Sequence, residues 1–578
     1  MAEQTLIADI ETDGLNPTKV HCLAIGTPEE GSEVLYADAE GYPPIIEGVE
    51  RLCKAGRVVF HNGLGFDYPV LRKFYGDTTE IKSIREKIYD TLIVSRMVDP
   101  TARRHGLKDW GERLGFPKGD HSDWSVFTED MGEYCKLDVA VTRRVLATLE
   151  AQWDDEWNNA LKLEHDFAFV IALQERHGFY LDVQACEELA AELRQEMADI
   201  ESELQEVFPP ITIERYSEKT GKRLKDKVEI FNPGSRKQIA ERLADRYNWT
   251  PKKFTPSGAP QIDEQVLEHM KYPEAKLLGR YFRCQKQMSQ ISEGDSAWLK
   301  CVDSEGFVHG SVNTIGTSTY RCSHFAPNVA QVDKKDLRMR DVWKPDPGQV
   351  LIGCDADALE LVMLAHYLGM FDGGEYRDAL LHGSKTEGTD VHSRTAKLVG
   401  VSRDDSKRVT YAFLYGASDR KLTQILKESN GKIKSGKEAR ERMKTGIKGL
   451  GRLSDLVLKR AKRGYVKGLD GRRVPIKSEH SALNFTLQSA GAILMKKALQ
   501  VFHFELCADH AYVIDDEPVH FNYCANVHDE IQITADPDHA INLGTLLADS
   551  IRIAGERLGL RCPTSGSYDI GSSWKETH

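Results

Sequence analysis

Residues 349–366 read QVLIGCDADALELVMLAH, and residues 522–535 read NYCANVHDEIQITA. Asp355 ends the apolar, strand-like run of the first stretch, and Asp529 lies between two strand-like runs of the second, which predict a β-hairpin. Adjacent strand and hairpin ends would bring these two carboxylates together. Carboxylates that close repel each other unless a divalent cation lies between them. The sequence therefore predicts a metal site at the end of a sheet.

Between these stretches, residues 402–418 (SRDDSKRVTYAFLYGAS) predict a helix that ends at Gly416. Arg403, Lys407, Tyr411 and Tyr415 recur every four residues and therefore lie on one helical face. A purely structural stripe would bury apolar groups, which the other faces of this helix already supply. Two cations followed by two aromatic rings match a ligand that has a triphosphate at one end and a base at the other.

A second set of carboxylates lies in the first 150 residues, where apolar runs alternate as in an α/β domain. Asp9 and Glu11 follow an apolar run, and residues i and i+2 of a strand point to the same face. Asp67 follows downstream, and Tyr134 and Asp138 share one helical face. Each acid alone is most often a helix cap or a solvated side chain, but the ordered set indicates a second metal site.

These motifs resemble two known families. DIETDGL (9–15), HNGLGFDYPVL (61–71) and YCKLD (134–138) resemble the three motifs of DEDD-type 3′→5′ exonucleases, in the subclass with a tyrosine in the third motif. The stretches that carry Asp355 and Asp529, together with the helix of residues 402–418, resemble the A family of DNA polymerases, the DNA polymerase I relatives. The order of exonuclease before polymerase resembles the bacteriophage branch of that family. This resemblance covers nearly the whole chain and includes FNPGSRKQI (231–239), HGSVN (309–313), TYRCSHFAPNVAQV (319–332), DVHSRTA (390–396), DGRRVPIKSEHSALNFTLQSAGAILMKKAL (470–499) and SYDIGSSW (567–574).

The resemblance implies an α/β and α+β multidomain fold, with an RNase H-like exonuclease domain followed by a right-hand polymerase. We expect the exonuclease domain over residues 1–150, the thumb over 151–300, the palm over 301–365 and 480–578, and the fingers over 366–479. The implied function is template-directed DNA synthesis from dNTPs on primed DNA, with 3′→5′ proofreading, in phage genome replication.

At the polymerase site, the resemblance implies that Asp355 and Asp529 hold two Mg²⁺ ions, which Mn²⁺ can replace. His392, Arg403 and Lys407 would grip the incoming triphosphate, since phosphoryl transfer requires positioning and charge stabilisation. Lys407 would also protonate the leaving pyrophosphate.

The resemblance assigns the remaining residues of this site to the base, the sugar and the DNA. Tyr411 would stack near the nascent base pair, and Tyr415 with Glu360 would wall the sugar site. Minor-groove acceptors are largely shared among correct pairs, so contacts there test shape rather than sequence. The residues implied to touch primer or template in this way are Arg321, Asn484, Gln488 and His528.

At the exonuclease site, Asp9, Glu11 and Asp138 would bind two metal ions, and Asp67 would complete the site. One ion would generate hydroxide and the other would stabilise the leaving 3′ oxygen. Tyr134 would orient the attacking water.

Three residues depart from the family pattern. Tyr320 replaces the usual small residue before Arg321, and Val362 stands where arginine is common. Asp357 replaces the usual serine after Ala356, and the sequence leaves open whether it perturbs the metal site or faces away from it. Tyr320 is expected to alter packing on the primer side.

The basic residues are concentrated in one segment. The chain of 578 residues has a net charge of −12, yet residues 421–477 contain 18 Lys and Arg against five acids. A solvated helical face is the alternative for a shorter run, but this length and excess favour a phosphate-binding surface. No segment approaches the roughly 18 uncharged apolar residues that a membrane span needs.

The N-terminal residues MAEQTLIADIE lack a basic stretch, so we expect no secretory signal and a cytoplasmic location, in the host if the chain is phage-encoded. The 11 cysteines contain no CxxC pair and are expected to be reduced packing residues, with neither a zinc site nor a disulfide framework.

Apolar positions between Leu189 and Val207 recur every three or four residues, which predicts a long helix within a helical arm. The polar stretch after Pro209 and Pro210 predicts a mobile tip. Residues 209–231 are too short for the long processivity-factor insertion of some phage relatives, so thioredoxin is not expected as a partner. A replisome helicase, a primase or another processivity factor remains an unidentified candidate.

Two rival functions fit parts of the pattern. A nuclease whose C-terminal part only binds DNA would not need Asp355, Lys407 and Asp529 together. A replication scaffold without enzymatic activity would need neither carboxylate set. Primer extension separates the first rival from a polymerase, and titration with Mg²⁺ or Mn²⁺ separates the second.

Overall fold

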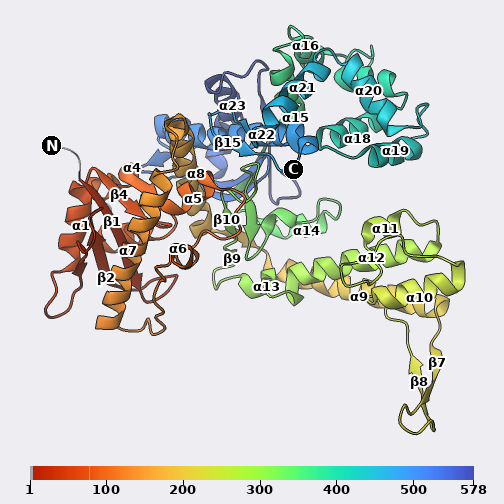
Figure 1. The fold of residues 1–578 in the computed structure, drawn as a ribbon, viewed down its shortest axis with the longest axis horizontal. Helices are drawn as coiled ribbons and strands as arrows, with labels where there is room; N and C mark the ends of the chain where they lie inside the picture. The colour runs from red at the N-terminus through yellow and green to blue at the C-terminus, as the bar shows by residue number, and fades with distance from the viewer. Residues whose placement is uncertain (1–3, 77) are drawn as a thin grey trace.

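The computed structural model describes residues 4–76 and 78–578 (Figure 1). The first residues of the N-terminal segment, on which the expected lack of a secretory signal partly rests, lie outside the described residues. The described part contains a sheet-based N-terminal unit, a central sheet, a helical lobe and a long helical arm.

The N-terminal unit is built on a five-stranded sheet in the order β3-β2-β1-β4-β5. Strand β1 is central, antiparallel to β2 and parallel to β4, and α7 packs across β1 and β2. The apolar residues of β1 and β2 are buried. The strands are β1 Thr5–Thr12, β2 Val20–Gly26, β3 Val34–Tyr36, β4 Arg57–Phe60 and β5 Ile88–Asp90; the longer helices are α1 Ile45–Lys54, α2 Asp67–Tyr75, α5 Thr91–Val98, α6 Leu107–Arg113 and α7 Glu129–Glu150.

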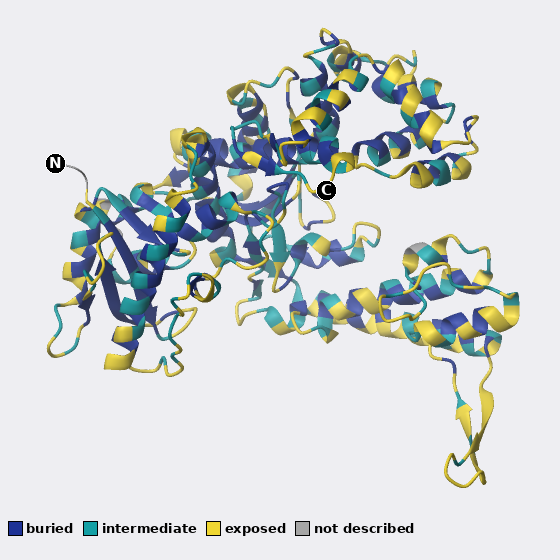
Figure 2. Ribbon diagram, viewed as in Figure 1, coloured by how far each residue is buried: buried dark blue, intermediate teal, exposed yellow. Residues whose placement is uncertain are grey.

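The central sheet has the order β18-β19-β13-β20 and is antiparallel throughout. Helices α22 and α23 pack against each other beside it, and α8 contacts both α22 and β18. This sheet lies at the junction of the other parts (Figure 2). Its strands β13, β18 and β19 are largely buried, whereas the edge strand β20 is half-buried or exposed. Its elements are β13 Val350–Ala356, β18 Phe521–Val527, β19 Glu530–Ala535, β20 Gly566–Gly571, α8 Asn158–His177, α22 Ala482–Val501 and α23 Ala540–Arg557.

The helical lobe lies between β13 and α22 in the sequence and stands above the arm in Figure 1. Serine or aspartate side chains cap helices α17 to α20, and Ser402 accepts a hydrogen bond from the backbone of Asp405 at the start of α18. Its helices are α15 Leu359–Leu368, α16 Glu375–His382, α17 Val391–Val399, α18 Arg403–Leu414, α19 Asp419–Glu428, α20 Gly436–Gly446 and α21 Leu450–Ala461, and the strands β14 Tyr465–Lys467 and β15 Arg473–Pro475 follow.

The arm is a pair of long helices, α9 Val183–Val207 and α12 Pro273–Met288, which pack along each other. The long helix predicted from the apolar seam is confirmed, and Leu189, Leu193, Ile200 and Leu204 are buried. The shorter helices α10 Arg236–Tyr247 and α11 Glu264–Glu268 lie at the tip, and α13 Trp298–Cys301 lies near the base. The tip of the arm contacts the lobe, because Nε2 of His269 lies 3.1 Å from Oε1 of Glu428 in α19.

The polar stretch expected as a mobile tip forms a β-hairpin, β7 Ile211–Tyr216 with β8 Arg223–Glu229. It projects from the arm, and nearly all of its residues are exposed (Figure 2). Its polar composition hid the β-branched residues Ile211, Thr212, Ile213 and Val228, which favour a strand.

Short strands join these units. They are β6 Phe179–Leu181, β9 Phe307–Val308 and β12 Trp343–Lys344 in one sheet, β10 Ser311–Asn313 with β11 Ser323–Phe325, and β16 Val513–Ile514 with β17 Glu517–Pro518. All 11 cysteines are free and eight are buried, which agrees with the expected packing role. Among the described residues, none of the helices combines the length and the apolar character that a membrane crossing requires.

Candidate active sites

Asp355 and Asp529 meet at one end of the central sheet. The predicted hairpin is confirmed: β18 and β19 are joined by the turn His528–Asp529, and Asp355 on β13 pairs with Glu530 on β19. The backbone N–H of Ala356 donates to the carbonyl of Asp529 over 3.1 Å, which fixes the two acidic residues side by side.

Electrostatics at this sheet end favour a bound cation. Burial, followed by the charges of Asp529 and Glu530, raises the pKa of Asp355 to about 7. Burial and then Glu360 raise the pKa of Asp529. Oδ1 of Asp355 is buried without a hydrogen-bond partner, so the site offers an unsatisfied carboxylate oxygen of the kind that Mg²⁺ or Mn²⁺ accepts. Two acids in this state fit a divalent ion.

Glu530 has a different environment from its two acidic neighbours. Its carboxylate receives a hydrogen bond from Nε1 of Trp574, and its Oε2 lies within ion-pair distance of Nδ1 of His578, at 2.8 Å, and of the buried guanidinium of Arg340, at 3.6 Å. Although burial opposes ionisation, these partners hold the pKa of Glu530 below its ordinary value. Glu530 is therefore a paired structural acid, and the sequence analysis did not identify Arg340 or His578 as its partners.

The cationic stripe of α18 is confirmed as a helical face. Arg403 Nε donates to Asp390 Oδ2 over 2.7 Å, and Lys407 Nζ lies 3.6 Å from Asp404. His392, on the adjacent α17, has a buried Nδ1 without a partner. Burial and the nearby charge of Arg403 lower the pKa of His392. These three basic side chains form a cluster at the N-terminal half of α18, where the helix dipole also favours an anion.

The aromatic end of the stripe reaches Glu360. Helix α18 ends at Leu414, and Tyr415 is its C-cap residue, followed by Gly416 with φ of +71°. The hydroxyl of Tyr415 donates to Oε1 of Glu360 over 2.6 Å, and its ring stacks on Tyr411 with centroids 6.3 Å apart. Arg321 lies 3.6 Å from the same Glu360 carboxylate.

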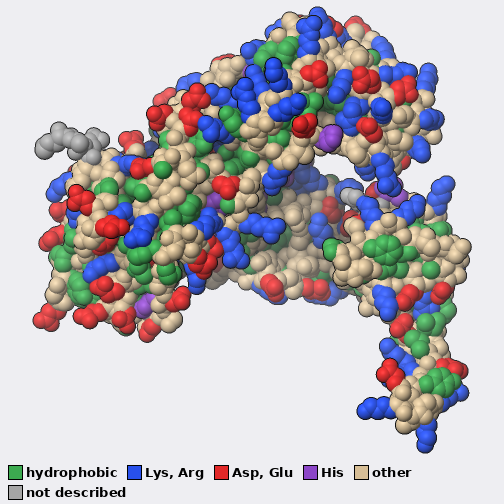
Figure 3. All heavy atoms as spheres, in the orientation of Figure 1, with side chains coloured by type: hydrophobic (Ala, Val, Ile, Leu, Met, Phe, Trp, Pro, Cys, Tyr) green, Lys and Arg blue, Asp and Glu red, His purple; other side chains and the backbone are tan. Residues whose placement is uncertain are grey.

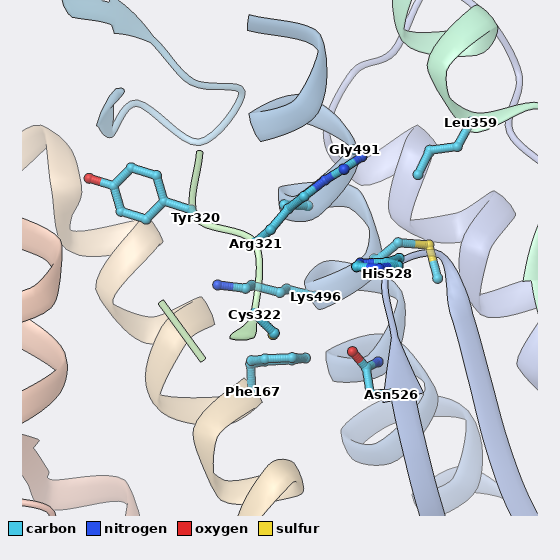
Figure 4. Close-up of a pocket in the computed structure, with 11 residues that line it drawn as sticks. Phe167, Tyr320, Arg321, Cys322, Leu359, Gly491, Lys496, Asn526 and His528 are labelled. Atoms are coloured by element: carbon cyan, nitrogen blue, oxygen red, sulfur yellow. The ribbon is translucent and has the colours of Figure 1, made fainter. Parts of the chain in front are cut away.

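Figure 4 shows the small cavity beside this cluster, where Arg321 and His528 lie close to Gly491 of α22. Burial, and then the charge of Arg321, lower the pKa of His528. Asn484, two turns before Gly491, donates from Nδ2 to the carbonyl of Leu414 over 3.2 Å, and Gln488 lies between them on α22. Of the four residues expected to touch primer or template, Arg321 and His528 thus line one cavity, Asn484 contacts the end of α18, and Gln488 lies one turn after Asn484 on α22.

The structure decides the three departures from the family pattern. Both carboxylate oxygens of Asp357 accept hydroxyl hydrogen bonds, from Ser565 over 2.7 Å and from Ser567 over 2.9 Å, so Asp357 faces β20 and not the metal position. Val362 is one of the buried residues of α15.

Tyr320 joins two parts of the chain, and its expected effect on primer-side packing stays a prediction. Its ring is buried and turned away from Arg321 in Figure 4. Its hydroxyl lies 3.0 Å from the carbonyl of Met97 and 2.8 Å from that of Arg473. A positive φ of 63° directs the side chain toward this contact between the N-terminal unit and the lobe.

The second carboxylate set also converges. Asp9 and Glu11 lie on β1, Asp67 begins α2, and Asp138 lies on α7. Ligand atoms of Asp9, Glu11 and Cys135 lie within 4.8 Å of one another, and Oδ1 of Asp138 is buried without a partner.

The pKa shifts of these acids have one main cause. Burial raises the pKa of Glu11 to about 8, of Asp67 to about 7 and of Asp138 to about 6. Burial, then Asp138 and Glu11, raise that of Asp9. Buried acids that repel one another suit divalent cations.

Lys118 is a residue of this second site that the sequence analysis missed. Its ammonium forms an ion pair with Asp138 and lies 4.6 Å from the ring centroid of Tyr134. The neighbouring Asp138 outweighs burial and raises the pKa of Lys118. No motif signalled this residue, because it lies in a loop 20 positions before its partner.

The basic segment, residues 421–477, contributes mostly exposed cations, and Lys and Arg side chains are spread over the lobe in Figure 3. Arg472 is an exception, since it is 1% exposed and pairs with Glu164 and Asp470. Arg440 pairs with Asp419 over 2.7 Å. The unpaired positive charge that the basic segment presents at the surface is therefore smaller than the number of its Lys and Arg residues suggests.

Comparisons with known proteins agree with this arrangement. The family model described as DNA polymerase family A matches residues 183–576. A DNA-directed DNA polymerase of Enterobacteria phage T3 is 30% identical over 99% of this chain and 100% of the relative. That of Escherichia phage T7 is 29% identical over the same shares.

A similar solved structure is described as the POL domain of Pol1 from M. smegmatis in complex with DNA primer-template and dNTP. Its TM-score is 0.76 at 19% identity, over 100% of this chain and 96% of that chain. At this identity, the likeness concerns the fold alone.

Proposed function

The chain belongs to DNA polymerase family A, and we propose that it joins template-directed DNA synthesis from dNTPs to 3′→5′ proofreading at a separate site. The observation that carries the proposal is the convergence of Asp355 and Asp529 near Tyr411, on the stripe of α18 that also carries Arg403 and Lys407. Phosphoryl transfer needs carboxylates for divalent ions and cations for the triphosphate. The carboxylates at the sheet end and the cations along α18 would supply these two requirements.

At the synthesis site, Asp355 and Asp529 would hold two Mg²⁺ ions, which Mn²⁺ can replace. Bound ions of this kind activate the attacking oxygen and stabilise the leaving one. Arg403, Lys407 and His392 bind the triphosphate, and Lys407 supplies a proton from Nζ to the leaving pyrophosphate.

The remaining polymerase-site residues align the base, sugar and DNA. Tyr411 stacks at the nascent base pair, and Tyr415 and Glu360 close the sugar site. The residues that contact the minor groove of primer and template are Arg321, Asn484, Gln488 and His528. The shared cavity of Arg321 and His528, and the contact of Asn484 with the end of α18, support this assignment.

At the proofreading site, Asp9, Glu11 and Asp138 would hold a second pair of divalent ions, with Asp67 completing the acidic set. Tyr134 orients water. Lys118 neutralises part of the carboxylate charge, since it already pairs with Asp138. The buried acids and the unpartnered oxygen of Asp138 support this part of the proposal.

The phage relatives favour a role in phage genome replication, in the cytoplasm of a host cell. The exposed hairpin β7–β8 is short, so a thioredoxin clamp is not part of the proposal. A replisome helicase, a primase or another processivity factor is a candidate partner for the exposed surfaces.

Separating the two activities tests the proposal. The double variant Asp9→Ala and Glu11→Ala should lose primer degradation while extension persists. Asp529→Ala should do the reverse. The measurement is a time course of one labelled primer on a template, with and without dNTPs. Loss of both activities in either variant, when circular dichroism shows it folded, would contradict the two-site assignment.

A further inference from the structure

A group of metal-binding side chains lies at the opposite end of the β18–β19 hairpin from Asp529. His520 precedes β18, Asp536 follows β19, and His539 lies in the turn that leads into α23. Because Phe521 pairs with Ala535, the residues just outside this pair meet. The backbone N–H of Asp536 donates to the carbonyl of His520 over 3.0 Å. Six to seven residues of strand separate this group from Asp529, about 20 Å at roughly 3.3 Å per residue.

The three side chains present ligand atoms to one point. One such atom from each of His520, Asp536 and His539 lies within 4.8 Å of the others. Nδ1 of His520 is 2.9 Å from Oδ2 of Asp536. The two imidazole rings stack with centroids 4.2 Å apart and planes at 29°. Stacked imidazoles would repel if both were protonated, whereas a shared metal ion requires both to be neutral.

Neighbouring residues orient these side chains. Asn542 Nδ2 donates to Oη of Tyr512 over 3.0 Å, and Oη of Tyr512 lies 3.1 Å from Nδ1 of His539. Nε2 of Gln349 donates to Oδ1 of Asp536 over 2.9 Å, which leaves Oδ2 directed at His520. Contacts to the far nitrogen of a histidine and the far oxygen of a carboxylate orient metal ligands in known sites.

We propose that His520, Asp536 and His539 form a binding site for a divalent transition metal, with Zn²⁺ as the best match. Two imidazoles and one carboxylate suit Zn²⁺, which takes three protein ligands and a water in open sites. Mg²⁺ prefers an all-oxygen environment. The side chain of His520 is 45% exposed, so solvent can reach a fourth position.

The position of the site suggests what the metal does. The short hairpin β16–β17 ends two residues before His520. Its connecting residues form ion pairs with the N-terminal unit: Asp515 with Lys82 over 2.9 Å, and Asp516 with Arg85 over 2.7 Å. A metal at His520 would fix the base of this hairpin to the start of α23, and so hold the contact between the N-terminal unit and the central sheet.

Cobalt serves as a spectroscopic probe of the site. The full chain is titrated with Co²⁺ in excess Mg²⁺, which occupies the carboxylate sites, and visible absorption is recorded. We expect bands of four-coordinate Co²⁺ that Zn²⁺ abolishes. His539→Ala should remove them, as should His520→Asn, chosen because asparagine tolerates the φ of 66° at this position. His510→Ala, an exposed histidine outside the cluster, is the matched control and should retain them.

The proposal is overturned if the wild-type chain shows no such bands, if both cluster variants keep them, or if the spectrum shows sulfur ligation from a cysteine. Primer extension in Mg²⁺ checks that each variant is folded. The proposed fixing of the β16–β17 hairpin by the metal is tested separately by hydrogen exchange. Zn²⁺ should slow exchange of residues 513–520 in the wild-type chain and in His510→Ala but not in His539→Ala. Equal exchange with and without Zn²⁺ in the wild-type chain would show that the metal does not fix the β16–β17 hairpin.

Discussion

Glu360 is fixed by side chains from two distant segments. Tyr415 donates a hydrogen bond to it, and Arg321 lies within ion-pair distance. A carboxylate held on two sides occupies a defined volume. Glu360 lies next to Asp529, and its charge is the second cause, after burial, of the raised pKa of Asp529. This rigidity is what steric exclusion of a 2′-hydroxyl requires, since an apolar pocket rejects an added hydroxyl by only about a hundredfold.

Shortening Glu360 should therefore weaken sugar discrimination. We expect Glu360→Ala to raise the ratio of kcat/KM for a ribonucleotide to that for the matched deoxyribonucleotide by tenfold or more, about 1.4 kcal/mol, even if total activity falls. Single-nucleotide insertion kinetics measure this ratio. Tyr415→Phe keeps the ring and removes only the hydrogen bond, so it should change the ratio less. An unaltered ratio in Glu360→Ala would exclude it as the gate.

The acids of both sites make stability depend on pH and metal. Folding raises the pKa of Glu11 to about 8 and those of Asp67 and Asp355 to about 7. The folded metal-free chain therefore binds more protons than the unfolded chain between about pH 4 and pH 8, so these acids lower its stability as pH rises through that window. If these acids are the proposed metal ligands, Mg²⁺ would bind their ionised form and offset the loss.

Thermal unfolding should show this linkage. In chelator, the melting temperature should fall between about pH 5.5 and about pH 8, and Mg²⁺ should restore it more at the higher pH. The variant Asp9→Asn with Glu11→Gln should show a smaller fall in chelator. Equal stabilisation by Mg²⁺ at both pH values would contradict the assignment of these acids as metal ligands.

At the scale of elements, helices α19 to α21 turn apolar residues inward and cations outward. Leu422, Ile425 and Leu426 of α19 are buried, as are Leu450 and Leu453 of α21. The lysines and arginines of the basic segment are exposed because helical periodicity places them on the face opposite the buried apolar residues.

Three exposed lysines near the end of α21 test whether this surface binds DNA. If Lys459, Lys462 and Lys477 contact phosphates, changing all three to glutamine should weaken template binding for every sequence. The slope of log K against log salt should become shallower by about 0.7 to 0.9 for each lost contact. Fluorescence anisotropy over a salt series measures the slope.

The matched control changes Lys54, Lys108 and Lys575, which are exposed on other parts of the chain. It removes the same charge and should leave the slope nearly unchanged. If both triple variants shift the slope equally, the basic segment acts only through net charge and is not a phosphate-binding surface.

At the scale of the whole molecule, a buried ion-pair network joins the parts. Glu164 of α8 receives Arg472 from the lobe and Lys496 Nζ of α22, the latter at 2.8 Å from both carboxylate oxygens. All three residues are at most 2% exposed. Removing the acid would leave two cations buried with too little compensating charge.

Glu164→Ala should therefore destabilise the chain by about 3 to 5 kcal/mol, the usual cost of breaking a buried pair. Glu150→Ala is the matched control, because it breaks the exposed pair with Arg57 and should cost less than about 1 kcal/mol. The midpoints of urea unfolding, followed by tryptophan fluorescence, compare the two. Similar midpoints would show that the network contributes little to stability.

Local patterns predicted much of the fold and of the candidate sites. The hairpin around His528 and Asp529, the long helix of the arm and the stripe of α18 all follow from spacings within one element. The sequence did not predict the β7–β8 hairpin, because its charged residues masked the β-branched ones. The mobility of this tip stays a prediction.

The sequence by itself determined which acids and cations would be available and which of them share an element, because side-chain direction follows backbone periodicity. Tertiary structure alone decided the partners. It turned Asp357 toward Ser565 and Ser567, buried Arg472 against Glu164, and brought Lys118 to Asp138. These outcomes depend on contacts between elements, and no short-range pattern encodes where a distant segment will pack.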